Sequence, residues 1–318
     1  MKVVILGGTG ILSTSISQKC IEKSFEVYNF KRSQGGVREN VKIILGDRNN
    51  KADLRKVLKV KPDIIIDMLC FDEEAAKLSA EVFKNEISQY IFCSTSCVYT
   101  PVKGAASLVE ESATEPYTEY GNSKLSAEKV FRESEKKKYF NVTIFRPGSV
   151  FNDRFIVNHL TMNGFDVLAR MKKNMDVVLS DGGTQHFQLC HSSNIGAAFS
   201  GACGNELCFG NTYNIAGEEA YTWNDIYRIE KEILGSKSQI IYMDSDKLLA
   251  KGKDKLSFME TVTAYDWNHN TKKLHAHIED YSYKANFEKS IEKIIKQKYQ
   301  SLDEASCEDD LYNLILDI

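Results

Sequence analysis

The sequence has no apolar run of the roughly 20 residues that a membrane-spanning helix needs. Its first residues, Met-Lys-Val-Val-Ile-Leu, lead directly into two glycines, so this apolar stretch is too short for a signal peptide. No internal repeat or low-complexity block occurs either. We therefore expect a soluble protein that works in the cytoplasm, where it is made.

The eight cysteines lack the spacing of a disulfide framework or a metal site. None forms a Cys-x-x-Cys pair or pairs with histidine at zinc-finger spacing. Free buried thiols in a reducing cytosol are the simplest interpretation. His269, His275 and His277 have no metal-like grouping with carboxylates, and we interpret them as surface or core residues. No metal site is predicted.

An excess of positive charge is also missing, because the formal net charge is -3. Binding to nucleic acid through bulk electrostatics needs clustered Lys and Arg that neutralise phosphates. The composition therefore disfavours a nucleic-acid partner. It leaves room for a local basic pocket that binds a phosphorylated small molecule.

The first half of the chain alternates short β-branched runs with amphipathic helical stretches. Leu12, Ile16 and Cys20, for example, recur every four residues and form one buried helix stripe. Such a succession predicts an α/β fold with a parallel, doubly wound sheet and right-handed crossovers. We expect strands at 2–6, 25–30, 41–45, 64–68, 90–93 and 142–145, and helices at 53–60, 73–83 and 120–137.

The alternation becomes weaker after about residue 150, where helices, short strands and aromatic residues mix. This change indicates a smaller lobe that covers the cleft and binds the substrate. The last segment is acidic, with apolar residues at helical spacing, and forms either a terminal helix or a partly ordered tail. The predicted parts are a dinucleotide-binding domain at 1–150 with return segments near 190–216, a substrate-binding lobe at 151–300, and an acidic tail at 301–318.

A glycine-rich turn, GGTGILS at 7–13, follows the first predicted strand and opens a helix. Glycines in such a turn let the backbone approach a pyrophosphate, which then lies at the positive end of the helix. Ser13 replaces the third glycine, so helix and strand must tolerate its side chain. A turn without a ligand is the alternative, but the position at the start of a βαβ unit favours a dinucleotide site of the Rossmann type.

Two cations and a hydroxyl, Lys31, Arg32 and Ser33, follow the second predicted strand. A NAD-specific site usually has an acidic residue here that binds the ribose 2′-hydroxyl. Cations suit a 2′-phosphate instead, so we predict NADP as the preferred cofactor over NAD; a solvated basic turn is the alternative. Asp47 would accept a hydrogen bond from the adenine amine, and the stem of Arg48 would pack on the ring.

A tyrosine and a lysine lie four residues apart in the segment YGNSK at 120–124. They share one helix face, so the phenol and the ammonium would lie together. A phenol titrates near ~10, but the Lys124 cation favours the phenolate and would lower the pKa of Tyr120. Lys124 would also bind the nicotinamide ribose. Thr95, at the end of the fifth strand, would donate to the substrate oxygen, which predicts a catalytic set at the carboxyl edge of the sheet.

These motifs together resemble the extended short-chain dehydrogenase/reductases, the NAD-dependent epimerase/dehydratase family. The matching segments are GGTGILS, LGDR, STSCVY, YGNSK and RPGSVF, in the family's order and spacing, and the resemblance covers roughly residues 1–280. It implies a bound nicotinamide dinucleotide and hydride transfer at a sugar carbinol, most often on a nucleotide-linked sugar. It also suggests a homodimer through the long helices.

The resemblance assigns roles by position. Thr95, Tyr120 and Lys124 match the family's catalytic residues. Arg154 is interpreted as a substrate contact, and a surface arginine is the alternative. The expected substrate contacts are Thr95, Ser96, Arg154, His186 and Gln188. The expected cofactor contacts are Gly7, Thr9, Gly10, Ile11, Leu12, Lys31, Arg32, Asp47, Arg48, Leu69, Tyr120, Lys124 and Pro147.

Departures from the family pattern reduce the number of reactions that we expect for this protein. Ser96 and Cys97 stand where the family's 4,6-dehydratases have acidic residues, and the related decarboxylases have Glu at the place of Cys97. Both activities are therefore disfavoured. The long insert that sugar-nucleotide epimerases have after the fourth strand is absent. This shorter layout looks more like the subgroup that contains the chloroplast stem-loop RNA-binding proteins.

Three functions remain open. The first is an NAD(P)-dependent epimerase or oxidoreductase that acts on a nucleotide-linked sugar. The second is an NADPH-dependent keto-sugar reductase. The third is a Rossmann-type protein that binds RNA or senses a dinucleotide without turnover; the intact Thr95, Tyr120 and Lys124 and the acidic net charge argue against it.

Overall fold

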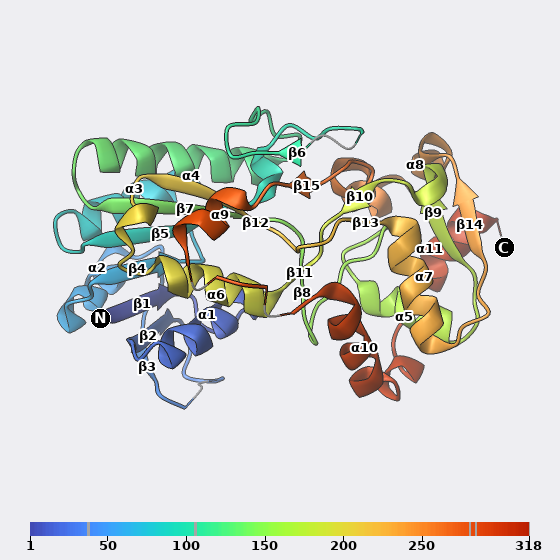
Figure 1. Ribbon diagram of the computed structural model, residues 1–318, viewed down its shortest axis with the longest axis horizontal. Helices are drawn as coiled ribbons and strands as arrows, with labels where there is room; N and C mark the ends of the chain where they lie inside the picture. Colours follow the sequence, from blue (N-terminus) through green and yellow to red (C-terminus); the bar gives the residue numbers. More distant parts are fainter. Residues whose placement is uncertain (37–38, 105–106, 280, 284, 318) are drawn as a thin grey trace.

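The computed structural model describes residues 1–36, 39–104, 107–279, 281–283 and 285–317 and has two lobes (Figure 1). The larger lobe is a sheet with helices on both faces, and the smaller lobe lies at its other end, towards the C-terminus. None of the helices in these residues is long and apolar enough to cross a membrane. All eight cysteines are free thiols.

The central sheet has seven parallel strands, which confirms the predicted doubly wound Rossmann fold. From β1 the chain continues to β2 and β3 on one side and then crosses to β4 on the other side of β1. A topological switch point therefore lies between β1 and β4, and ligands of such sheets bind at this point. In spatial order the strands are β3 (Val41–Leu45), β2 (Glu26–Lys31), β1 (Lys2–Leu6), β4 (Ile64–Asp67), β5 (Gln89–Cys93), β7 (Asn141–Pro147) and β12 (Asn211–Ile215).

Both faces of the sheet are buried, as the continuous apolar run of β1 requires. Val3 and Ile5 point into one core, and Val4 and Leu6 point into the other. Figure 1 shows one pair of helices on each face. These helices are α1 (Ile11–Glu22) with α6 (Ser192–Ala202), and α3 (Glu73–Phe83) with α4 (Glu119–Lys136).

The predicted helix at 53–60 starts earlier and changes its type. Helix α2 (Lys51–Arg55) begins after Asn50, whose side chain accepts hydrogen bonds from the amides of Ala52 and Asp53. An asparagine at this position satisfies amides that the first helical turn leaves without a partner. Residues 56–60 continue as a 3-10 helix.

The smaller lobe consists of helices around a parallel pair of strands, β9 (Val177–Ser180) and β14 (Ile240–Met243). Its core is rich in aromatic side chains, among them the fully buried Trp223 and Tyr227. Its helices are α5 (Gly164–Lys172), α7 (Trp223–Leu234), α8 (Ser245–Gly252), α10 (Phe287–Lys298) and α11 (Asp309–Leu316).

Short strand pairs connect the sheet with this lobe. The last helix of the chain, α11, packs against α8 of the same lobe. Of the two forms left open for the last segment, the helix is observed: α11 buries Leu311, Tyr312 and Ile315 against α8. The connecting elements are β6 (Ser107–Leu108), β8 (Val150–Phe151), β10 (His186–Phe187), β11 (Cys190–His191), β13 (Tyr221–Thr222), β15 (Asn268–His269) and α9 (Lys272–His277).

A buried carboxyl group in α7 makes the stability of this lobe depend on pH. Glu230 is 3% exposed, and burial raises its pKa from 4.5 to about 8. Between these two values the unfolded chain releases a proton that the folded chain keeps, so stability falls as the pH rises. We expect Glu230→Gln to remove this loss. The gain relative to wild type should grow between pH 4.5 and 8 to on the order of 4 kcal/mol.

The measurement is urea denaturation of both proteins at several pH values. The buried His159 and His269 act in the opposite direction, because burial lowers their pKa values to about 3 and about 4. They reduce stability below about pH 6.5 in both proteins alike, so the difference between wild type and variant isolates Glu230. A constant difference over this pH range would contradict the assignment.

Candidate active site

A cavity of about 720 Å³ lies at the carboxyl ends of β1, β2 and β4, at the switch point of the sheet. Gly7 has a φ of +106°, a left-handed backbone conformation that glycine adopts without strain. Gly10 caps α1 without a side-chain hydrogen bond, so no side chain competes for the first amides of the helix. The cavity gathers Gly7, Thr9, Gly10, Ile11, Leu12, Lys31, Arg32, Asp47, Arg48 and Leu69 from the predicted cofactor contacts.

The two cations predicted for the 2′-phosphate differ in their surroundings. Lys31 is buried, and its ammonium donates to the backbone carbonyl of Gly35 in the turn that follows β2. Arg32 is exposed at the rim of the cavity. Arg32 is therefore the side chain that is available to an anion without breaking a contact of the turn.

Arg48 lines the cavity with its stem, but its guanidinium points into the protein. It donates to a carboxylate oxygen of Asp67 at 2.8 Å, to the carbonyl of Ala75 at 2.8 Å and to the hydroxyl of Ser79 at 3.1 Å. Asp67 also accepts from the buried Tyr90 hydroxyl. Sequence reasoning missed this network, which holds the end of β4 in place below the cavity.

A second cavity, of about 280 Å³, continues from the first and shares Leu12, Met68 and Phe71 with it. It extends between the sheet edge and the smaller lobe, where aromatic and aliphatic side chains form much of its wall. The structure thus joins a dinucleotide-sized cleft to a small inner chamber. This chamber, which we call the catalytic cavity, contains Thr95, Ser96, Tyr120, Lys124, Pro147 and Gln188 of the predicted site.

The predicted lowering of the Tyr120 pKa by Lys124 is not found. The Lys124 ammonium is buried and donates to the carbonyls of Cys70 at 2.7 Å and Cys93 at 2.8 Å. Desolvation lowers the pKa of Lys124 itself. Tyr120 is 47% exposed, but its hydroxyl end lies towards Thr95, Cys93 and Cys97, and its desolvation there raises the pKa of the phenol.

A glycine brings the start of α4 against the segment that carries Thr95. A Cβ atom on Gly121 would lie 2.2 Å from the carbonyl oxygen of Cys97, so only glycine permits this close approach. Thr118 caps the helix by accepting from the Gly121 amide at 3.0 Å. Thr95 in turn accepts from the Cys97 amide at 3.2 Å. The two segments are therefore held together next to the Tyr120 hydroxyl.

The three other predicted substrate contacts differ in their positions. His186 does not line either cavity within the described part of the chain, because its ring Nδ1 lies 3.0 Å from a carboxylate oxygen of Asp266. Gln188 does reach the catalytic cavity, but its amide is committed to the carbonyl of Gly217 and the amide of His269. Arg154 lies elsewhere, in a separate groove.

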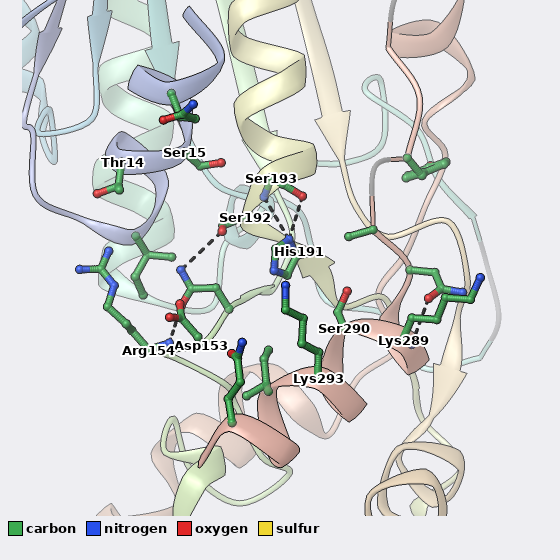
Figure 2. Close-up of a pocket in the computed structure, with 18 of the residues that line it drawn as sticks. Thr14, Ser15, Asp153, Arg154, His191, Ser192, Ser193, Lys289, Ser290 and Lys293 are labelled. Atoms are coloured by element: carbon green, nitrogen blue, oxygen red, sulfur yellow. Dashed lines mark hydrogen bonds between the residues drawn. The ribbon is translucent and has the colours of Figure 1, made fainter. Parts of the chain in front are cut away.

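The groove around Arg154 has a volume of about 1020 Å³ and a polar lining. Figure 2 shows Asp153 and Arg154 on one side and Lys293, from α10, reaching towards His191 at the start of α6. Among the described lining residues, Ile11 alone is common to this groove and the dinucleotide cavity. Sequence spacing did not reveal that Arg154 lines this groove, whereas Phe155, the next residue, lines the catalytic cavity.

Two further features were missed. The side chains of Glu128 and Arg146 form a buried ion pair at 2.7 Å behind the catalytic cavity, and Ser94 donates to the same carboxylate. His269, interpreted as a surface or core residue, is buried in the wall of the catalytic cavity. Arg146 lies in the RPGSVF segment, but the sequence does not show that it pairs with Glu128 or that His269 reaches this cavity.

Comparison with known families assigns the chain. The model of the NAD dependent epimerase/dehydratase family matches residues 3–216. The chain belongs to this family. The match spans the seven strands of the sheet, the glycine-rich turn and the Thr95, Tyr120 and Lys124 set.

Similar proteins include a reductase and a stem-loop binding protein. The 2′-dehydrokanamycin reductase of Streptomyces kanamyceticus is 24% identical over 74% of this chain and 67% of its own length. The chloroplast stem-loop binding protein of 41 kDa b of Arabidopsis thaliana is 23% identical over 71% of this chain and 61% of its own length. This chain thus spans about two thirds of these relatives or less.

Solved structures of epimerases share the fold. UDP-glucose 4-epimerase of Thermotoga maritima, solved with UDP-glucose, has a TM-score of 0.76 at 15% identity and covers 95% of this chain and 100% of its own. UDP-glucuronic acid 4-epimerase of Bacillus cereus, solved with UDP-glucuronic acid and NAD, has a TM-score of 0.73 at 18% identity and covers 94% of this chain and 100% of its own.

Proposed function

We propose that this protein catalyses NAD(P)-dependent hydride transfer at a sugar carbinol. One observation supports this most strongly: Thr95, Tyr120 and Lys124 meet in a small cavity that continues from a dinucleotide-sized cleft at the switch point of the sheet. The uncapped start of α1 and the left-handed Gly7 fit the pyrophosphate of such a cofactor. A bound nicotinamide would supply the acceptor or donor of the hydride.

Tyr120, Thr95 and Lys124 have separate proposed roles in this reaction. In its deprotonated form, Tyr120 takes the proton of the substrate hydroxyl on its phenol oxygen during oxidation, and the protonated phenol returns it during reduction. Thr95 donates a hydrogen bond to the same substrate oxygen. Lys124 lies below the phenol ring, 5.9 Å from its centre, and its ammonium is positioned by the two backbone carbonyls. Met68 and Phe71 line the junction of the two cavities.

A nucleotide-linked sugar is our proposed substrate, with the sugar inside the catalytic cavity and the nucleotide outside it. The epimerases that share the fold bind such molecules, and the family motifs support the same class. A keto-sugar reductase is the second candidate, supported by the likeness to 2′-dehydrokanamycin reductase. The likeness to the chloroplast stem-loop binding protein supports the RNA-binding alternative, but the intact Thr95, Tyr120 and Lys124 do not.

Three narrower predictions stay with this proposal. The lobe at 151–300 is proposed to bind the substrate over the cleft of the domain at 1–150. The protein is proposed to be cytoplasmic. A homodimer through the long helices is proposed from the family resemblance.

The proposal is tested by the small molecules that the purified protein holds and converts. Mass spectrometry of the denatured protein is expected to release NAD or NADP. An epimerase holding NAD⁺ should convert UDP-glucose to a stereoisomer without net change at 340 nm, whereas a reductase should oxidise added NADPH in the presence of a keto-sugar. Absence of a released dinucleotide, together with no dinucleotide binding in calorimetry, would exclude the proposal.

The cofactor preference is expected to depend on Arg32. In Arg32→Glu, a carboxylate replaces the exposed guanidinium at the rim of the cavity, which removes one charge-assisted hydrogen bond to a 2′-phosphate. We expect NADPH affinity to fall about 10- to 100-fold, while NADH affinity changes little. Calorimetric titration with both cofactors measures the effect. An equal loss of affinity for NADH and NADPH would mean that Arg32 does not distinguish a 2′-phosphate from a 2′-hydroxyl.

A further inference from the structure

His269 is a buried histidine in the wall of the catalytic cavity. It lies in β15 and is 4% exposed. Its ring stacks on Trp267 with an interplanar angle of 17° and a centroid distance of 6.0 Å. Its backbone amide donates to the side-chain oxygen of Gln188 at 2.5 Å. Trp267 thus packs on the ring, and Gln188 holds the backbone of the same residue.

Within the described residues, neither nitrogen of the His269 ring has a hydrogen-bond partner. The other buried histidine, His159, has a partner for one ring nitrogen: its Nε2 accepts from the Ser180 amide at 3.1 Å, whereas its Nδ1 has no partner among the described residues. Native proteins rarely bury a polar group without a partner, because the lost hydration costs free energy. Because His269 also lines the catalytic cavity, an imidazole there without a protein partner indicates a ligand that supplies one.

The surroundings of His269 define the chemistry of that ligand. The described lining of the catalytic cavity contains no Asp or Glu, and its only cation, Lys124, is bound to two carbonyls. Burial lowers the pKa of His269 to about 4, so the ring is neutral near pH 7 and offers one donor and one acceptor. A carboxylate or phosphate in the cavity would find no countercharge.

The shape of the cavity agrees with this chemistry. Its volume of about 280 Å³ lies at the small end of ligand pockets. Phe155, Phe187 and Trp267 offer apolar surface next to Thr95, Tyr120 and His269. Sugar rings present such a combination of C–H faces and hydroxyl edges.

We propose that His269 binds a hydroxyl or carbonyl group of an uncharged sugar ring and thereby selects neutral sugars over uronic acids. This inference rests on the proposed hydride transfer and names the substrate class of the same cavity. His269 and Tyr120 would hold the ring from two segments far apart in the sequence. The diphosphate of a nucleotide-linked sugar would remain outside the catalytic cavity.

The test uses the full-length protein loaded with NAD and three probes: UDP-glucose, UDP-glucuronic acid and UDP. Calorimetry is expected to show UDP-glucose binding at least tenfold tighter than UDP-glucuronic acid. His269→Phe, which keeps an aromatic ring but no polar atom, should weaken UDP-glucose binding at least tenfold and leave UDP binding unchanged. His269→Gln, which keeps one donor and one acceptor, should stay within about threefold of wild type. The exposed His275, replaced by Phe, is the matched control.

A measurement on the wild-type protein tests the inference without depending on the folding of the variants. The side-chain ¹⁵N resonances of His269 should shift on addition of UDP-glucose but not of UDP. If UDP-glucose binds and is turned over while these resonances and the affinity of His269→Phe remain unchanged, the inference is wrong and the proposed function stands. If no probe binds and no dinucleotide is held, the proposed function fails and this inference fails with it.

Discussion

Replacing Tyr120 by phenylalanine is expected to lower turnover by about 10²- to 10⁴-fold, the range for loss of a positioned acid or base. The phenol oxygen is the group in the catalytic cavity that can exchange a proton with the substrate next to Thr95. The dinucleotide cleft is built from other segments, so cofactor affinity should change little. Measurement of kcat and of the dissociation constant for the cofactor separates these two effects.

The pH dependence of the same variant provides an independent readout. Burial raises the pKa of Tyr120, so the phenol is protonated at neutral pH and loses its proton only as the pH rises. In the oxidation direction, wild-type kcat should therefore increase with pH above neutrality, and this increase should be absent in Tyr120→Phe. Tyr299→Phe, at an exposed position in the smaller lobe, is the control. Normal turnover of Tyr120→Phe would show that the phenol of Tyr120 is not the group that exchanges the proton with the substrate.

The largest expected loss of stability comes from Asp67→Asn. This substitution leaves the buried guanidinium of Arg48 without its carboxylate partner, 2.8 Å away in the wild-type protein. Removing one member of a buried ion pair costs about 3–5 kcal/mol, because the remaining charge stays desolvated. The Leu69 amide also donates to Asp67 at 2.8 Å, so the exit of β4 into the dinucleotide cavity should loosen.

Urea denaturation gives this free energy directly. Glu74→Gln is the matched control, because Glu74 pairs with Lys77 on the exposed side of α3 and such a pair contributes about 0–1 kcal/mol. Asp67→Asn is also expected to weaken cofactor binding, and saturating NADP should recover part of the lost stability. A loss no larger than that of Glu74→Gln would show that the buried pair does not stabilise the sheet edge.

Most of the sheet and part of the site could be predicted from local sequence patterns. The apolar run of β1 is buried on both faces, and GGTGILS opens α1 as predicted. The predicted catalytic residues lie in one cavity because Tyr120 and Lys124 occupy one helix and Thr95 follows closely after strand β5. These relations depend on helix periodicity and strand order, which a single sequence displays.

The sequence alone determined the fold class, the glycine-rich turn and the tyrosine–lysine spacing, because each depends on neighbours along the chain. Only the tertiary structure decided that Arg48 turns inward to Asp67, that Arg154 lines a separate groove and that His269 reaches the catalytic cavity. These outcomes depend on how distant segments pack and on which buried polar groups find partners. Neither is encoded in the spacing of residues.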